Sequence, residues 1–169
     1  GPIFCRYPRG EGEGVDFNDI VQDVEIGKGR IVKRGKDLAI LALGTRVGSA
    51  LKVADQMLQD NLKITVADAR FAKPIDTELL QKLWNEHQKL IIIEEGSAGG
   101  FSSHCLHFLS SKDLLNKHDK EIKCLTMPDN FQDHASQNEQ LARAGLDTNG
   151  LMKVVSKMIS LSNIKNKSI

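Results

Sequence analysis

Four apolar segments with the composition of β-strands alternate with helix-like segments along this chain of 169 residues, and this alternation limits the possible folds. The run Leu90–Ile93 is continuously apolar, which is typical of a strand buried on both faces. Strands separated by helices require right-handed crossovers and form a parallel sheet that helices cover on both sides. The pattern predicts a three-layer α/β/α domain with a five-stranded mixed, mostly parallel sheet. The four strand segments are Asp37–Leu43, Leu62–Ala67, Leu90–Ile93 and Ile122–Met127.

The fifth strand is expected at Gly29–Arg34, immediately before the first of these four. Only Gly35 and Lys36 separate it from Asp37–Leu43, and a short glycine-containing turn between two strand-like runs is typical of a β-hairpin. The sequence therefore predicts that this strand pairs with Asp37–Leu43 and adds an antiparallel edge to the sheet.

Capping residues mark where several helices begin and end. Asp76 or Thr77 can cap the helix that carries Trp84, and Ser136 with Glu139 has the spacing of a capping box. Gly145 is a plausible C-terminal cap for the helix that this box begins. Asp147 can cap the last helix, whose apolar residues follow helical spacing.

The chain divides into three parts by composition. Residues 1–24 contain one strand-like run followed by a segment rich in glycine and charge, with Gly10–Gly14 at its centre, which predicts a linker. Residues 25–161 hold the compact domain, and the polar, basic residues 162–169 are expected to fray. The chain has no initiating Met and opens in a strand-like run, so it could be a piece of a longer protein.

Composition excludes several classes of partner and location. Lys and Arg total 23 against 22 Asp and Glu, and this balance provides no excess positive charge to attract nucleic acid or an anionic membrane. Three widely separated cysteines fit a reducing compartment better than a disulfide framework. No apolar run approaches the roughly 20 residues that span a bilayer, and the N-terminal residues lack the pattern of a signal peptide. We therefore expect a cytoplasmic protein.

The loops that follow the parallel strands are the first places to look for a site, because ligands of open parallel sheets bind beyond the carboxyl ends of the strands. These loops are expected at Gly44–Arg46, Asp68–Phe71, Glu94–Gly96 and Met127–Asp129. Glu94 and Glu95 could act as acid and base. However, adjacent residues at a strand end point in opposite directions, so ion pairing or helix capping explains them as well.

Three further features have a possible chemical role and a simpler structural one. Gly96–Gly100 could present backbone amides to a phosphate, or could form a tight turn between strand and helix. His104 and His107 are spaced like two metal ligands on one helix, but no third ligand is fixed by spacing. Cys105 lies on the apolar face of that helix and is expected to be a packed, inert thiol.

Arg6 and Arg9 are the strongest candidates for ligand binding. They flank Pro8 in the run Arg6–Gly10, and two guanidinium groups beside a proline-fixed kink could hold a phosphate. Arg9 could equally be a solvated linker charge. The residues alone leave both interpretations open.

Six blocks occur in one order along the chain: Arg6–Gly10, Ile26–Gly29, Ala39–Thr45, Asp68–Asp76, Glu94–Gly96 with Gly99–Phe101, and Pro128–Phe131 with His134. Together they resemble the C-terminal part of the 1-deoxy-D-xylulose-5-phosphate synthases, in a bacterial version. The likeness extends from about Gly1 to Met158. Each block alone is weak evidence, but their joint occurrence is specific.

The resemblance implies a thiamine-diphosphate-dependent transferase that condenses pyruvate with glyceraldehyde 3-phosphate and releases CO2. This reaction begins isoprenoid synthesis by the non-mevalonate route and also supplies thiamine and pyridoxal synthesis. The chain would correspond to the last strand of the pyrimidine-binding domain, the linker, and a complete transketolase C-terminal-like domain. In such an enzyme, thiamine diphosphate and Mg²⁺ bind to the two preceding domains, and two copies of the enzyme form a homodimer.

The resemblance assigns one site residue in this chain. The family's arginine that contacts the phosphate of the aldehyde substrate matches Arg6, whereas Arg9 matches the motif with a less defined role. The family's Gly-Asp-Gly metal motif and catalytic histidines have no match here. We therefore expect no catalytic, cofactor-binding or metal-binding residue in this chain, and an inactive isolated fragment. Glu94, His104 and Cys105 should be dispensable for chemistry.

Two other interpretations remain. One is the C-terminal domain of a transketolase or of a 2-oxoacid dehydrogenase β chain, which shares the fold. The other is a free-standing α/β binding module that uses the loops at the strand ends. The blocks Arg6–Gly10 and Pro128–Phe131 favour the synthase over the first alternative, and the isolated strand-like run at Pro2–Pro8 argues against the second.

Overall fold

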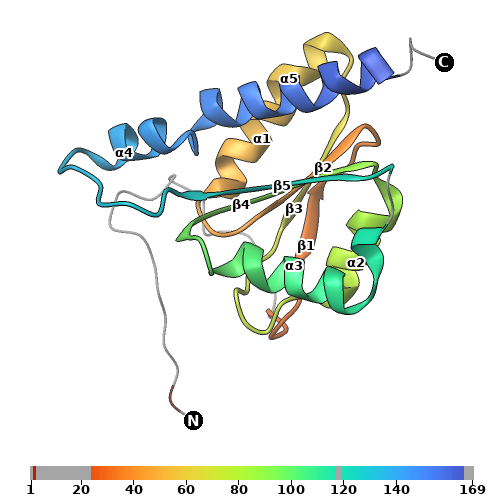
Figure 1. Cartoon of the computed structure of the whole chain (residues 1–169), viewed down its shortest axis with the longest axis horizontal. Helices are drawn as coiled ribbons and strands as arrows, with labels where there is room; N and C mark the ends of the chain where they lie inside the picture. Colours follow the sequence, from red (N-terminus) through yellow and green to blue (C-terminus); the bar gives the residue numbers. More distant parts are fainter. Residues whose placement is uncertain (1, 3–23, 117–118, 166–169) are drawn as a thin grey trace, which may run out of the picture.

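The computed structural model of the chain describes Pro2 and residues 24–116 and 119–165. After an initial strand, four further strands alternate with helices in the order that the sequence predicts (Figure 1). The strands are β1 (Arg30–Lys33), β2 (Leu38–Ala42), β3 (Ile64–Asp68), β4 (Lys89–Ser97) and β5 (Glu121–Met127). The α-helices are α1 (Arg46–Met57), α2 (Thr77–Glu86), α3 (Phe101–Ser111), α4 (Gln137–Ala144) and α5 (Thr148–Lys165), and two short 3-10 helices span Leu58–Asp60 and Leu114–Asn116.

One mixed sheet holds all five strands in the order β1-β3-β2-β4-β5. Strands β2, β3, β4 and β5 are parallel, and β1 runs antiparallel to its neighbour β3. This arrangement confirms the predicted mixed, mostly parallel sheet.

The predicted hairpin between the first two strands is wrong. Strand β3 lies between β1 and β2, so β1 pairs with β3 and not with β2. The connecting loop crosses the beginning of β3, where the backbone N–H groups of Lys36 and Asp37 both donate to the carbonyl of Lys63 at 2.9 and 3.0 Å. A Cβ at Gly35 would lie 2.3 Å from that carbonyl oxygen. Gly35 therefore permits a close crossing rather than a two-residue hairpin turn.

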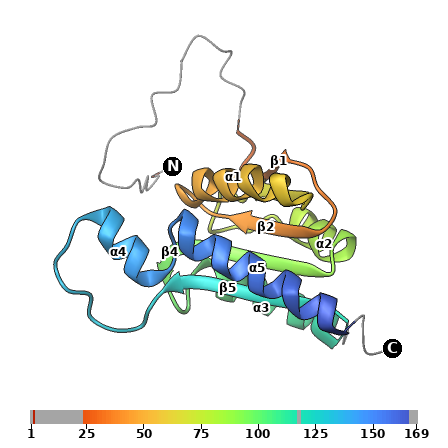
Figure 2. The same ribbon diagram turned by 90° about the horizontal axis from the view of Figure 1, so that it is seen from above.

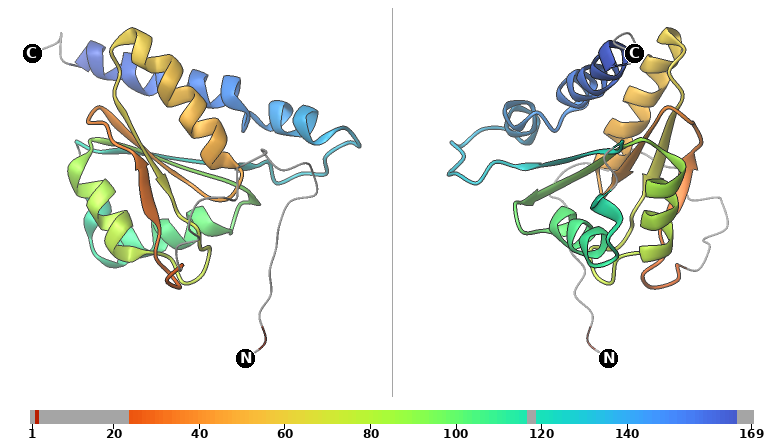
Figure 3. Two further views of the ribbon diagram at one scale, coloured as in Figure 1. Left: turned by 180° about the vertical axis from the view of Figure 1, so that it is seen from behind. Right: turned by 45° about the vertical axis from the view of Figure 1, so that its right-hand side comes forward.

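Helices cover both faces of the sheet, with α1 and α5 on one face and α2 and α3 on the other (Figures 1 and 2). Alternate residues of β2 supply the two cores: Leu38 and Ile40 face α1 and α5, and Ala39 and Leu41 face α2 and α3. The long helix α5 packs beside α1, as Figure 3 shows from behind. These layers confirm the predicted α/β/α architecture.

Helix caps confirm several sequence predictions. Asp76, rather than Thr77, caps α2 by accepting from the N–H of Leu79 at 2.9 Å. Ser136 and Glu139 form the predicted capping box of α4. Gly145 ends α4 with a φ of 69°, and Asp147 accepts from the N–H of Gly150 at the start of α5.

Two boundaries differ from expectation. Strand β4 continues through Glu94 and Glu95 to Ser97, so the turn into α3 is limited to Ala98–Gly100. Helix α5 continues to Lys165 and thus includes the first four residues of the expected tail. None of the helices in the described ranges is long and apolar enough to cross a membrane.

Candidate functional site

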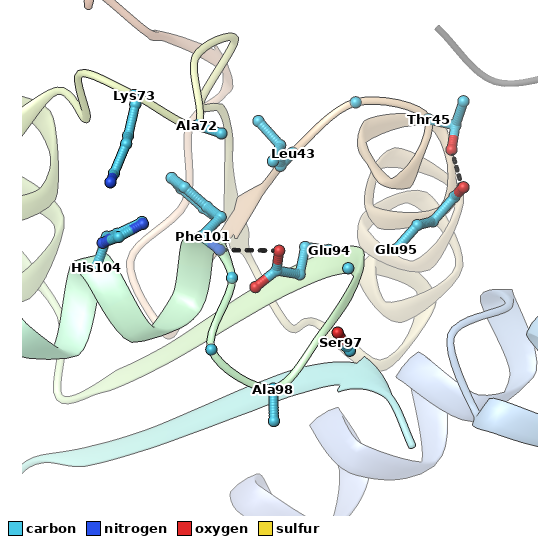
Figure 4. A pocket seen from close by; sticks show the side chains of 14 residues that line it. Leu43, Thr45, Ala72, Lys73, Glu94, Glu95, Ser97, Ala98, Phe101 and His104 are labelled. Atoms are coloured by element: carbon cyan, nitrogen blue, oxygen red, sulfur yellow. Dashed lines mark hydrogen bonds between the residues drawn. The ribbon is translucent and has the colours of Figure 1, made fainter. Parts of the chain in front are cut away.

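An open pocket of about 740 Å³ lies at the carboxyl ends of β2 and β4. Three segments line it: residues 43–45 after β2, residues 72–73 after β3, and residues 94–101 with His104 at the turn from β4 into α3 (Figure 4). The chain leaves β2 toward α1 on one face and leaves the adjacent β4 toward α3 on the other. Ligands of open parallel sheets bind at such a switch point. The structure therefore has a crevice where the sequence predicts a site.

Glu94 lies between the pocket and α3, with only 3% of its surface exposed. Its carboxylate accepts from the backbone N–H of Phe101 at 2.9 Å (Figure 4) and from that of Ser102 at 2.7 Å. These two amides belong to the first turn of α3, where backbone donors have no partner within the helix. Glu94, on the preceding strand, thus caps α3. This is the structural role that the sequence leaves open beside a catalytic one.

The glycine-rich turn leaves space for this carboxylate. A Cβ at Gly96 or Gly100 would lie 2.5 or 2.6 Å from Oε2 of Glu94. Gly99 has a φ of +95°, and the N–H of Gly100 donates to the carbonyl of Ser97. Because the first amides of α3 already bind Glu94, they are not available to a phosphate, and Gly96–Gly100 is a tight turn rather than a phosphate loop.

Glu95 points away from Glu94, as adjacent strand residues should. Its carboxylate accepts from the hydroxyl of Thr45 and pairs with the Arg46 guanidinium at 3.0 Å. Arg46 is itself buried and donates to the carbonyl of Leu146 at 2.7 Å. Glu95 and Arg46 therefore connect β4, α1 and the turn between α4 and α5, and the two glutamates do not form an acid–base pair on one substrate.

Lys73 and His104 face the pocket from the wall opposite Glu95 (Figure 4). The Lys73 side chain extends toward the His104 ring, and the sequence does not single out Lys73 as a site residue. Its position depends on the fold of the loop after β3, which brings it beside α3. His107, by contrast, is exposed on α3.

Within residues 24–116 and 119–165, no group of three or more His, Cys, Asp and Glu side chains is arranged to hold a metal ion. His104 and His107 consequently have no third ligand in the described part of the chain.

Cys105 packs in the core between α3 and the sheet with no exposed surface. Burial raises the pKa of its thiol to about 12, with smaller contributions from Cys124 and Glu94. Burial also raises the pKa of Cys124. Cys105 therefore has the environment of the packed thiol that the sequence predicts. Its thiol stays protonated at neutral pH, and a protonated thiol is a weak nucleophile.

The other two strand ends hold smaller features. Asp68 accepts from the N–H of Arg70 and pairs with Arg30 at 3.4 Å, which stabilises the end of β3. After β5, residues 128–132 and Ser97 line a second open pocket of about 470 Å³. Phe131, one of these lining residues, is fully exposed.

Arg6 and Arg9 lie outside the described residues. Their assignment to phosphate binding stays a prediction.

Residues 27–151 match the family model described as "Transketolase, C-terminal domain". The chain belongs to the transketolase C-terminal domain family. This transketolase C-terminal domain is similar to a solved structure titled "Split gene transketolase, inactive beta4 tetramer", with 28% sequence identity and a TM-score of 0.71. The match covers 82% of this chain and 44% of that chain, so the chain spans less than half the length of that transketolase.

Proposed function

We propose that this domain is the C-terminal part of a 1-deoxy-D-xylulose-5-phosphate synthase. The complete enzyme would condense pyruvate with glyceraldehyde 3-phosphate, with loss of CO2, and would use thiamine diphosphate and Mg²⁺. Membership of the transketolase C-terminal domain family supports a thiamine-dependent enzyme of this kind.

The choice of the synthase over a transketolase rests on the six blocks that resemble the synthases, and on Arg6–Gly10 and Pro128–Phe131 above all. Four of the six blocks fall at the carboxyl ends of the four parallel strands: Ala39–Thr45 at β2, Asp68–Asp76 at β3, Glu94–Gly96 with Gly99–Phe101 at β4, and Pro128–Phe131 with His134 after β5. The similarity is thus concentrated at the edge where the sheet carries its pockets. We propose that thiamine diphosphate and Mg²⁺ bind to other parts of the assembled enzyme, because the family's Gly-Asp-Gly metal motif has no match in this chain, and that this enzyme is a homodimer.

A transketolase is the second candidate, because the solved structure that resembles this domain carries that title. The test is to purify the natural polypeptide that contains this sequence and to supply thiamine diphosphate and Mg²⁺. Release of CO2 from pyruvate that depends on glyceraldehyde 3-phosphate would support the synthase. Two-carbon transfer from a ketose phosphate to an aldose phosphate, without release of CO2 from pyruvate, would establish the transketolase instead.

A further inference from the structure

The pocket at the ends of β2 and β4 has the size and place of a small-molecule site. Its volume of about 740 Å³ lies within the range of roughly 300 to 1,000 Å³ that is usual for ligand pockets. Its described lining residues all belong to this domain, whereas the proposed function assigns thiamine diphosphate to other parts of the enzyme.

The two walls of this pocket differ in charge. Lys73 and His104 lie on one wall (Figure 4), and their side chains make no hydrogen bond or ion pair with the rest of the described chain. The Lys73 ammonium is a point charge suited to a phosphate, and an imidazole N–H beside it can donate a further hydrogen bond. This wall therefore offers donors that the fold itself does not use.

The opposite wall presents acceptors. Glu95 binds Thr45 and Arg46, but a carboxylate has about four acceptor positions, so capacity remains for further donors. The Glu94 carboxylate, by contrast, is occupied by the amides of α3 and buried. Because Arg46 pairs with it at 3.0 Å, Glu95 adds little net charge to this wall, but its remaining acceptor positions favour a hydroxyl group that donates to it.

We propose that this pocket binds a small phosphorylated polyol. Its phosphate would contact Lys73 and His104, and its hydroxyl groups would face Thr45 and Glu95. The donors on one wall and the acceptors on the other would fix this orientation. The proposal stands or falls independently of which reaction the complete enzyme catalyses.

The test is an NMR titration of the ¹⁵N-labelled chain with three probes: glycerol 3-phosphate, inorganic phosphate and glycerol. Glycerol 3-phosphate should cause saturable shifts of backbone amides around Lys73, His104 and Glu95. Inorganic phosphate should bind more weakly, and glycerol more weakly still. Equal affinity for glycerol 3-phosphate and inorganic phosphate would overturn the polyol part of the proposal, and absence of saturable shifts would overturn all of it.

Variants separate this site from general electrostatic attraction. Lys73→Ala should weaken glycerol 3-phosphate binding about 10- to 150-fold, the usual effect of losing a charge-assisted hydrogen bond. His104→Ala should also weaken it. Lys82→Ala removes an exposed ammonium from α2 that does not line the pocket and should leave the affinity unchanged. Equal effects of Lys73→Ala and Lys82→Ala would contradict the proposal. Because Lys73 is exposed, its replacement should not disturb folding, and the spectrum of the free variant checks this.

Discussion

The carboxylate of Glu94 is held from two sides. The backbone amides of Phe101 and Ser102 bind its two oxygens, and the bare Cα atoms of Gly96 and Gly100 leave it just enough space. A buried charge is tolerated only where hydrogen bonds replace those of water. The position therefore requires a carboxylate and two glycines together.

We predict that Glu94→Gln lowers the free energy of unfolding by about 2 kcal/mol, because a carboxamide presents one oxygen to two amide donors. In thermal unfolding this loss corresponds to a midpoint about 4 to 8 °C lower. Glu86→Gln is the matched control, since Glu86 is exposed on α2, and should change the midpoint little.

The glycines give a second check of the same contact. Gly100→Ala should also destabilise the domain, since its Cβ would displace the Glu94 carboxylate. The double variant should lose less stability than the sum of the single losses, because both changes disrupt one contact. Additive losses in denaturant unfolding would show that Gly100 and Glu94 act independently.

The raised pKa of Cys105 predicts a dependence of stability on alkaline pH. The unfolded thiol ionises near pH 8.5 and the folded thiol near pH 12, so between these values the folded state holds a proton that the unfolded state has lost. This contribution to stability is fully present below pH 8.5 and falls by up to about 1.4 kcal/mol per pH unit above it. Denaturant unfolding between pH 7.5 and 10 should show a smaller slope for Cys105→Ala than for the wild type; equal slopes would contradict the assignment.

We predict that Arg6 contributes to substrate binding by contacting the phosphate of glyceraldehyde 3-phosphate. In the complete enzyme, Arg6→Ala should reduce kcat/KM with glyceraldehyde 3-phosphate about 10- to 150-fold, through loss of a charge-assisted contact to phosphate. Cys105→Ala should leave kcat unchanged in the same assay, because the thiol is buried in the core. Unchanged efficiency of Arg6→Ala would refute its assignment.

At the scale of elements, Asp76 connects two parts of the fold. One carboxylate oxygen caps α2 at Leu79, and the other accepts from the N–H of Gly29, just before β1, at 2.9 Å. We predict that Asp76→Ala costs about 2 to 3 kcal/mol of stability, the sum of a lost cap and a second hydrogen bond. Thr77→Ala should cost less than about 0.5 kcal/mol, since Thr77 is exposed and does not cap the helix. Comparable losses for the two variants would contradict this division of roles.

Local patterns sufficed to predict most elements. The capping box of Ser136 depends only on residues three apart, and the position of Leu90–Ile93 follows from its continuous apolarity. Strand pairing was predicted wrongly, because the short connection at Gly35 and Lys36 resembles a hairpin turn. The true partner of β1 is specified by contacts with Lys63, Val66 and Ala67, which are remote in sequence. Strand order is a property of the assembled sheet and is not encoded near the turn.

The candidate site was predictable to a similar degree. The rule for parallel sheets placed it at the strand ends, and strand alternation predicted that Glu94 and Glu95 would diverge. Lys73 was missed because nothing in its local sequence indicates that the loop after β3 brings it to α3. The partnership of Glu95 with Arg46 was missed for the same reason, since the two residues are 49 positions apart.

At the scale of the whole molecule, the proposed function assigns thiamine diphosphate and Mg²⁺ to other parts of the complete enzyme. We predict that calorimetric titration of the 169-residue chain with both together produces no saturable heat. Micromolar binding would mean that the cofactor site lies in this chain. A cooperative thermal unfolding transition of the same sample serves as the control that the domain is folded.

The position of β3 between β1 and β2 affects how the domain can be made on a ribosome. Strand β1 is synthesised first, but its only partner in the sheet, β3, begins about thirty residues later. At usual translation rates this interval is about two to six seconds, during which β1 can form none of its native ladder. During this interval the unpaired β1 segment carries positive charge from three basic side chains, Arg30, Lys33 and Arg34. Charges on an unpaired strand discourage its association with other nascent chains.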